Sequence, residues 1–125
     1  MPKVMIIDDS RVMRKIIGGA VTELGFTWCE AANGKEALTK LATEAPPVDA
    51  IFVDWNMPEM NGYEFICEIR KGGAYLKTPI MMITTETTQD QIEKALTAGA
   101  NEYVMKPFTK DAIQSKLELL GLLSA

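Results

Sequence analysis

Five short apolar runs recur along the chain, and each is followed by a longer segment with helical periodicity. The runs lie at residues 3–7, 27–31, 50–53, 80–83 and 102–105. Nearly continuous apolar runs of this length are typical of strands that are covered on both faces. Strands that alternate with helices in this way predict an α/β domain with a parallel sheet between two layers of helices.

The segments between the runs carry the capping residues expected at helix ends. Ser10 precedes a periodic segment that extends to Leu24, and Gly25 is suited to end that helix. Asn33 and Thr109 are positioned to begin two further helices. The remaining two helices are expected around residues 65–69 and from about residue 89 to residue 99. The pattern therefore predicts five strand–helix units.

Chemically reactive side chains follow four of the five strands. They are Asp8 and Asp9 after the first strand, Asp54 after the third, Thr84 after the fourth and Lys106 after the fifth. The carboxyl ends of parallel strands form the side of an open sheet where ligands bind, so we expect these side chains to converge. Close carboxylates favour a hard cation such as Mg²⁺. A hydroxyl and a lysine beside that cation would bind a phosphoryl group, which a carboxylate can accept as an aspartyl phosphate.

Composition and charge exclude several other kinds of site. The chain has 125 residues, the size of a single domain, and no histidine, which excludes Ser-His-Asp catalysis and imidazole zinc sites. Its net charge of −4 argues against direct binding of nucleic acid. The first apolar stretch meets an acid after seven residues, and no apolar run is long enough for a membrane span. We therefore expect a cytoplasmic protein without membrane insertion.

Several motifs carry a resemblance to a known family. They are the Asp8-Asp9 pair, the segment Asp54-Trp55-Asn56-Met57-Pro58, Gly62, Thr84, and the segment Tyr103-Val104-Met105-Lys106-Pro107-Phe108. In this order, at the ends of predicted strands, they resemble the receiver domain of response regulators, in particular the single-domain chemotaxis regulators of the CheY type. The resemblance covers the whole chain and implies one receiver domain over residues 1–125. It also implies the doubly wound, flavodoxin-like (CheY-like) fold, (βα)5, with strand order 2-1-3-4-5.

The resemblance implies a role for each residue at the strand ends. Asp54 would accept a phosphoryl group from a histidine kinase, while Thr84 and Lys106 would contact the phosphoryl oxygens. The Lys106–Pro107 peptide bond would be cis. Such a domain catalyses its own phosphorylation and dephosphorylation and is not an enzyme acting on an external substrate. The cofactor would be Mg²⁺, held by Asp8, Asp9, Asp54 and the backbone carbonyl of Asn56.

A two-state switch is also implied by the resemblance. Thr84 would move toward the phosphoryl group and Tyr103 would follow, which would change the surface formed by the helix from residue 89, the strand 102–105 and the last helix. The exposed members of this partner surface are expected to be Ile92, Tyr103, Met105 and Lys116.

Two residues would tune the lifetime of the phosphorylated state. Asn56 and Glu86 can both contact the water that attacks the acyl phosphate, and this predicts a short-lived signal. Thr85 is a departure from the family, because the residue after the hydroxyl is usually small. Its bulk would narrow the path to the phosphoryl group and act in the opposite direction, by slowing entry or hydrolysis.

The partners follow from the same resemblance. A chemotaxis histidine kinase would supply the phosphoryl group, and the flagellar motor switch protein would receive the output from a monomeric regulator. An alternative is a phosphorelay shuttle or phosphate sink that passes the phosphoryl group to a histidine phosphotransfer protein. A Mg²⁺-dependent hydrolase, from a different class, would need a general base or a second metal. A flavodoxin-like cofactor module is disfavoured because the Asp8-Asp9 pair would repel the FMN phosphate.

Overall fold

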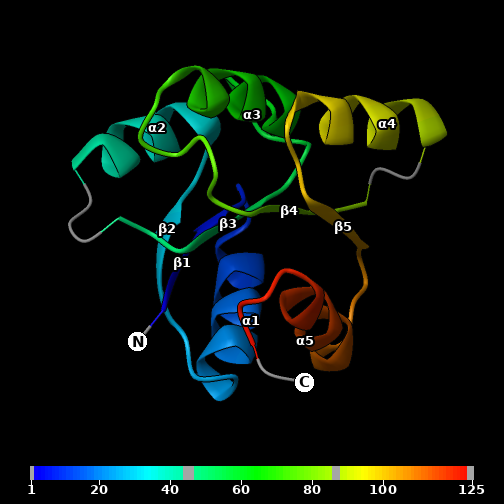
Figure 1. Cartoon of the computed structure of the whole chain (residues 1–125). Coiled ribbons are helices and arrows are strands. Elements are labelled where there is room, and N and C mark those ends of the chain that lie inside the picture. Colours follow the sequence, from blue (N-terminus) through cyan, green and yellow to red (C-terminus); the bar gives the residue numbers. More distant parts are fainter. Residues whose placement is uncertain (1, 44–46, 86–87, 124–125) are drawn as a thin grey trace.

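The computed structural model describes residues 2–43, 47–85 and 88–123, in which strands and helices alternate along the chain (Figure 1). The strands are β1 (Lys3–Ile7), β2 (Thr27–Ala31), β3 (Ala50–Val53), β4 (Ile80–Thr84) and β5 (Glu102–Met105). The helices are α1 (Arg11–Glu23), α2 (Gly34–Thr43), α3 (Gly62–Lys71), α4 (Gln89–Ala98) and α5 (Lys110–Leu119). The predicted α/β architecture is confirmed.

The strands form one parallel sheet with the order β2-β1-β3-β4-β5, which confirms the expected topology. Helices α1 and α5 cover one face of the sheet, and α2, α3 and α4 cover the other (Figure 1). The strand order reverses at β1, whose neighbours are β2 and β3. Ligands bind outside the carboxyl ends of the strands at such a reversal, so the fold itself selects the ends of β1 and β3 as a site.

Each face of the sheet packs against its own apolar cluster. Along β1, Met5 and Ile7 belong to one cluster, whereas Val4 and Ile6 belong to the other. Phe65 of α3 joins the first cluster. This division follows from the alternation of side chains along a strand, and burial on both faces explains why the strands are apolar throughout.

The helix starts agree with their capping residues, with one difference at α3. The side chains of Ser10 and Thr109 accept hydrogen bonds from the first turns of α1 and α5, as expected. Helix α3 begins earlier than the apolar pattern indicates. Asn61 and Glu64 form a reciprocal capping box, in which each side chain accepts from the other residue's backbone N–H, at 2.8 and 3.0 Å. This cap sets the start of α3 at Gly62.

Arg70 joins two loops at the amino-terminal edge of the sheet. Its guanidinium donates to the carbonyl oxygens of Tyr75 (2.6 Å) and Gly99 (2.8 Å) and to Asn101 Oδ1 (3.1 Å). Burial lowers the pKa of Arg70 from its usual value. Asn101 Oδ1 also accepts from the N–H of Ile80. Arg70 therefore fixes the entry to β5, the strand that leads to Lys106.

Candidate functional site

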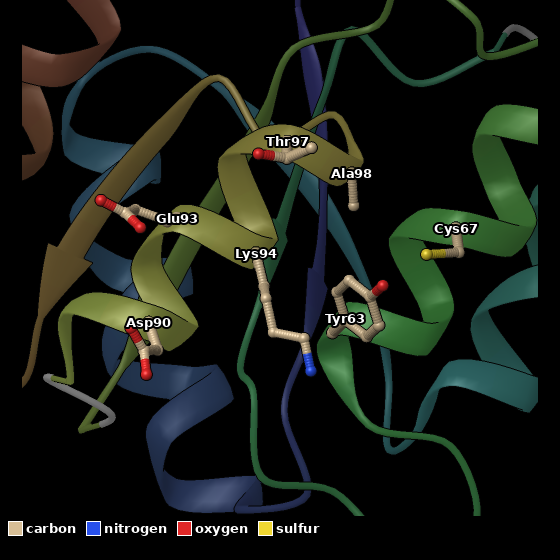
Figure 2. A pocket seen from close by; sticks show the side chains of 7 residues that line it. All are labelled: Tyr63, Cys67, Asp90, Glu93, Lys94, Thr97 and Ala98. Atoms are coloured by element: carbon tan, nitrogen blue, oxygen red, sulfur yellow. The ribbon is translucent and has the colours of Figure 1, made fainter.

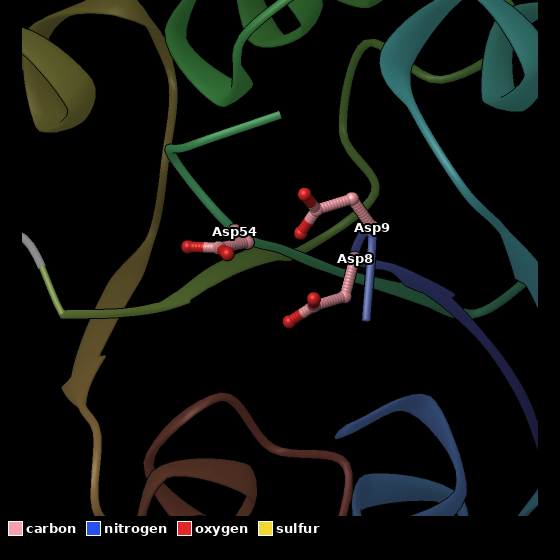
Figure 3. Close-up of side chains that lie close together, drawn as sticks. All are labelled: Asp8, Asp9 and Asp54. Carbon is pink, nitrogen blue, oxygen red and sulfur yellow. The ribbon is translucent and has the colours of Figure 1, made fainter. Parts of the chain in front are cut away.

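Three carboxylates meet at the carboxyl ends of β1 and β3. Each of Asp8, Asp9 and Asp54 contributes one oxygen to a group whose members all lie within 4.8 Å of one another (Figure 3). The backbone N–H of Asp54 donates to the carbonyl of Ile7 at 3.0 Å, so the pairing of the two strands extends to the acids. Asp8 and Asp54 are 1% and 7% exposed, whereas Asp9 is exposed. The sheet thus brings together the acids that the sequence places at its strand ends.

Lys106 supplies the positive charge of the site from the end of β5. Its ammonium donates to Asp8 Oδ2 at 2.7 Å and to Asp54 Oδ2 at 3.3 Å. The Lys106–Pro107 peptide bond is cis, as expected. One cation shared by two buried carboxylates leaves the cluster with a net negative charge.

Asp54 Oδ1 is a buried oxygen without a hydrogen-bond partner among the described residues. A buried carboxylate oxygen left without a partner carries a desolvation penalty, which a bound cation would offset. The cluster offers carboxylate oxygens only, and these are the ligands that Mg²⁺ prefers in proteins. The donor set and the unpartnered oxygen therefore fit a Mg²⁺ ion.

Asp8 and Asp9 differ in their surroundings although they are adjacent in sequence. Asp8 Oδ1 accepts from the N–H of Ser10 at 2.9 Å, and Asp8 Oδ2 accepts from Lys106. Both carboxylate oxygens of Asp8 are therefore already engaged within the protein. Asp9 lies on the solvent side of the cluster. This arrangement favours Asp9 over Asp8 as a direct ligand of a cation.

Thr84 is the last residue of β4 and is completely buried. Its carbonyl accepts from the N–H of Lys106 at 2.9 Å, so the two residues lie at neighbouring strand ends. Tyr103 pairs with Met82 in the sheet and packs partly buried against the cluster beneath α2, α3 and α4. Thr84 and Tyr103 thus lie on adjacent strands, as the proposed switch requires.

The structure describes Asn56 and Thr85, two of the residues expected to affect the lifetime of the phosphorylated state. Asn56 is exposed and lies two residues after Asp54. Thr85 is exposed at the end of β4. Glu86 lies outside the described residues, and its role stays a prediction.

The expected partner surface needs a correction. Met105 is 52% exposed, but Ile92, Tyr103 and Lys116 are half-buried, so the expectation that all four are exposed is wrong for three of them. Tyr103 packs against the core, and Lys116 is held by an ion pair with Glu102 at 2.8 Å. The three side chains contribute only part of their surface.

An aromatic stack next to Asp54 was not anticipated from the sequence. The rings of Trp55 and Tyr63 are stacked with centroids 5.8 Å apart, and the ammonium of Lys94 lies 5.1 Å from the Tyr63 centroid. Hydrogen bonding to Cys67 raises the pKa of Tyr63 above its usual value. The only sequence signal was that Trp55 and Tyr63 are two large rings close to Asp54. Nothing in their spacing predicts the stack.

Tyr63 also lines a cleft between α3 and α4 (Figure 2). The cleft has a volume of about 580 Å³ and is lined by Tyr63, Cys67, Asp90, Glu93, Lys94, Thr97 and Ala98. The acidic cluster lies outside this lining. The cleft is therefore separate from the carboxylates. Tyr63 of the cleft stacks on Trp55, the residue that follows Asp54.

The fold and the acidic cluster agree with a family match. The family model of the response regulator receiver domain matches residues 4–118. The chain belongs to this receiver domain family. Receiver domains generally bind Mg²⁺ at an acidic pocket, and they are signalling proteins rather than enzymes acting on external substrates. The resemblance to receiver domains that the sequence motifs indicated is therefore confirmed.

Known receiver domains of chemotaxis regulators are similar to this one over nearly their full length. Chemotaxis protein CheY1 of Helicobacter pylori is 40% identical over 119 residues, which cover 94% of this chain and 95% of the relative. The structure of CheY4 of Vibrio cholerae has a TM-score of 0.88 at 34% identity and covers 96% of this chain and 98% of that one. This receiver domain is therefore of the CheY type, consistent with two-component signalling.

A third relative is described with a metal ion. The receiver domain of a Pseudomonas aeruginosa sensor histidine kinase, with a magnesium ion coordinated in its active-site cleft, has a TM-score of 0.84 at 28% identity. The match covers 94% of this chain and 95% of that one.

Within the described part of the present chain, no helix is long and apolar enough to cross a membrane.

Proposed function

We propose that the chain is a cytoplasmic phosphotransfer switch, a single receiver domain over residues 1–125 that accepts a phosphoryl group from a histidine kinase onto Asp54. The observation that carries this proposal is the position of Asp54. It is buried, its Oδ2 is bound by Lys106, and its Oδ1 has no partner among the described residues. A carboxylate held in this way beside a cation is suited to act as a nucleophile toward phosphorus.

Asp9, Asp54 and the backbone carbonyl of Asn56 would hold the Mg²⁺ ion, and Asp8 would help to hold it. Two features support this set: the oxygens of the three acids lie within 4.8 Å of one another, and Asp9 faces solvent. The magnesium described in the related kinase receiver domain adds support. When bound, the ion neutralises negative charge at the reacting oxygens.

The chain's own residues would bind and orient the phosphoryl group. An oxygen of Asp54 attacks the phosphorus of a phosphohistidine, so that a P–O bond forms while the P–N bond breaks and the imidazole leaves. Lys106 already contacts Asp54 and would pair with a phosphoryl oxygen. Thr84 would donate its hydroxyl to another. In dephosphorylation, water would attack the phosphorus, so that a new P–O bond forms while the bond to the Asp54 oxygen breaks, which releases inorganic phosphate and the free carboxylate. Asn56 and Glu86 would contact that water.

The output would pass from Thr84 through Tyr103 to the surface of α4, β5 and α5. Tyr103 lies on the strand next to Thr84, and exposed Met105 continues the same strand. Ile92 and Lys116 would contribute their exposed portions. This surface would have two arrangements, and the phosphoryl group would stabilise one of them more than the other. The difference in free energy sets the fraction of molecules in the arrangement that is favoured by phosphorylation.

An apolar patch on α1 supports docking of the phosphodonor beside Asp54. Val12 and Ile16 are 68% and 52% exposed and lie one turn apart near the start of α1, which begins two residues after Asp9. The exposed cations Arg11 and Lys15 flank them. A histidine kinase of the chemotaxis type would dock here.

The receiver of the output is proposed from the relatives. The chemotaxis proteins among them support regulation of the flagellar motor switch protein by a monomeric regulator. The alternative is a phosphorelay shuttle or sink that exchanges phosphate with a histidine phosphotransfer protein. The Val12–Ile16 patch is compatible with this alternative too, since either histidine protein could dock on an exposed apolar patch of the helix that begins two residues after Asp9.

The test is phosphorylation followed by intact mass and by Trp55 fluorescence. We expect acetyl phosphate with Mg²⁺ to add one phosphoryl group to the wild type and none to Asp54→Asn, while Asp90→Asn, an exposed acid on α4, behaves as the wild type. Equal labelling of Asp54→Asn would disprove the proposed acceptor. Phosphorylation-dependent binding of a motor-switch peptide, compared with transfer to a histidine phosphotransfer protein, then separates the two outputs.

A further inference from the structure

Arg14 connects the metal-ligand segment to two elements of the fold. It lies on α1, and its side chain is only 13% exposed. Its Nη1 donates to the backbone carbonyl of Asp8 at 2.6 Å, and its Nε donates to Glu30 Oε1 on β2 at 2.6 Å. The planar guanidinium can make both bonds at once because its donors point in different directions. The backbone between Asp8 and Asp9 is therefore braced from α1 and β2.

The carbonyl of Asp8 belongs to the same rigid peptide unit as the N–H of Asp9. A peptide unit is planar, so a hydrogen bond to the Asp8 carbonyl oxygen restricts rotation of the whole unit. The same bond therefore restricts the position of the Asp9 Cα atom. Asp9 itself is exposed, in contrast to Asp8. The bond from Arg14 thus acts on the backbone that carries the exposed acid.

The other polar atoms of Asp8 are held as well. Its N–H donates to the carbonyl of Ala31 at 3.1 Å, and its carboxylate accepts from Ser10 N–H and from Lys106. Arg14 supplies the partner of the last polar atom, the carbonyl oxygen. Glu30 is in turn fixed by Lys40, whose ammonium donates to its carbonyl at 2.6 Å.

We propose that Arg14 is a positioning residue for Asp9, and that it sets the affinity of the cluster for Mg²⁺ through the Asp8–Asp9 peptide. This inference rests on the proposed Mg²⁺ site. Residues that orient metal ligands typically change metal affinity by roughly 10- to 100-fold when they are replaced. Arg14 acts through the backbone and does not itself contact the cation.

A role of Arg14 through its charge and a role through positioning Asp9 predict opposite changes in Mg²⁺ affinity when Arg14 is replaced. Arg14 is a cation near an acidic cluster, so if its charge alone matters, Arg14→Met will bind Mg²⁺ more tightly than the wild type. If it positions Asp9, the same variant will bind Mg²⁺ more weakly. Arg11→Met is the matched control, because it removes the same charge from the same helix at an exposed position.

The experiment measures Mg²⁺ binding by Trp55 fluorescence and Mn²⁺ binding by electron paramagnetic resonance in the full chain. We expect a loss of roughly 10- to 100-fold for Arg14→Met and a smaller loss for Arg14→Lys, which keeps the charge but cannot bond to both partners. We expect Arg11→Met to bind at least as tightly as the wild type. Circular dichroism and thermal melting without metal confirm that each variant is folded at the titration temperature.

Unchanged or tighter binding in both Arg14 variants would overturn the proposal. If Arg14→Met does not fold, Arg14→Lys alone decides, since unchanged affinity in that variant excludes a role for the two bonds. Failure of the wild type to bind either ion would instead overturn the proposed metal site and this inference with it. The wild type and the variants therefore distinguish the two failures.

Discussion

Gly62 packs directly against the backbone carbonyl of Asp54. A Cβ atom at Gly62 would clash with that oxygen, and the N–H of Gly62 donates to the carbonyl of Trp55 at 2.9 Å. The start of α3 therefore packs against the segment that begins at Asp54. Only a residue without a side chain allows this close approach.

We predict that Gly62→Ala destabilises the protein and weakens Mg²⁺ binding. The methyl group would meet backbone atoms of Asp54 that cannot rotate away, so this segment must shift, at a cost of about 1–3 kcal/mol. Urea denaturation measures the stability, and Trp55 fluorescence measures the binding. Gly19→Ala is the control, since nothing lies within 4 Å of a Cβ there and an alanine inside α1 should stabilise by about 0.5–1 kcal/mol. Equal effects of the two substitutions would contradict the proposed contact.

Replacing Lys106 should have opposite effects on stability and on metal affinity. Lys106→Met leaves Asp8 Oδ2 and Asp54 Oδ2 buried without their shared cation, which should lower the free energy of unfolding by about 1–3 kcal/mol in the absence of metal. Mg²⁺ then no longer competes with an ammonium, so its affinity should rise while phosphorylation by acetyl phosphate is slowed.

Calorimetry with and without Mg²⁺ tests this prediction. Lys110→Met is the matched control because Lys110 forms an exposed ion pair with Glu23, whose loss should cost less than about 1 kcal/mol and leave Mg²⁺ affinity unchanged. Weaker Mg²⁺ binding in Lys106→Met would show that the lysine does not compete with the cation.

The stack of Tyr63 on Trp55 predicts a fluorescence change. In a Trp28→Phe background, Tyr63→Leu should shift the emission of Trp55 to longer wavelength, because the ring that covers the indole is lost. Aromatic pairs contribute about 0.5–1.5 kcal/mol beyond their buried area, so stability should fall by a similar amount. Tyr63→Phe keeps the ring and removes the hydroxyl, and it should retain the emission of its background. A red shift in both variants would trace the effect to the hydroxyl instead.

The pair formed by Lys40 and Glu36 predicts a pH dependence. Hydrogen bonding to Lys40, 3.1 Å away, lowers the pKa of Glu36 below 4.5. A lowered pKa in the folded state contributes stability above the unfolded pKa, and this stability is lost as the pH falls through the folded value. The side chains of Lys40 and Glu36 are 46% and 41% exposed, so screening by solvent limits the contribution to about 0.5 kcal/mol at neutral pH.

Lys40→Met should therefore raise the pKa of Glu36, measured by carbon NMR of its carboxyl group. The stability difference from the wild type should shrink as the pH is lowered below 4.5, because protonated Glu36 loses its charge in both proteins. Any stability difference that persists in acid would come from the hydrogen bond between Lys40 and the backbone carbonyl of Glu30, because that carbonyl does not titrate.

Sequence patterns alone determined the elements and the side of the sheet where the chemistry lies. The strands are apolar because both faces are covered, and the caps at Ser10 and Thr109 satisfy free N–H groups locally, so both signals can be read from neighbouring residues. The acids and Lys106 follow the ends of parallel strands, which all point toward one edge. That edge was therefore predictable without knowledge of any contact.

Only the tertiary structure decided how these residues divide their tasks. Asp8 and Asp9 are neighbours of identical chemistry, yet one is buried against Lys106, 98 residues away, and the other faces solvent. The bond from Arg14 to Asp8 and the close approach of Gly62 to Asp54 likewise depend on how helices seat on the sheet. Local patterns specify which face of an element is covered, but the distance between two side chains is set by the packing of the whole domain.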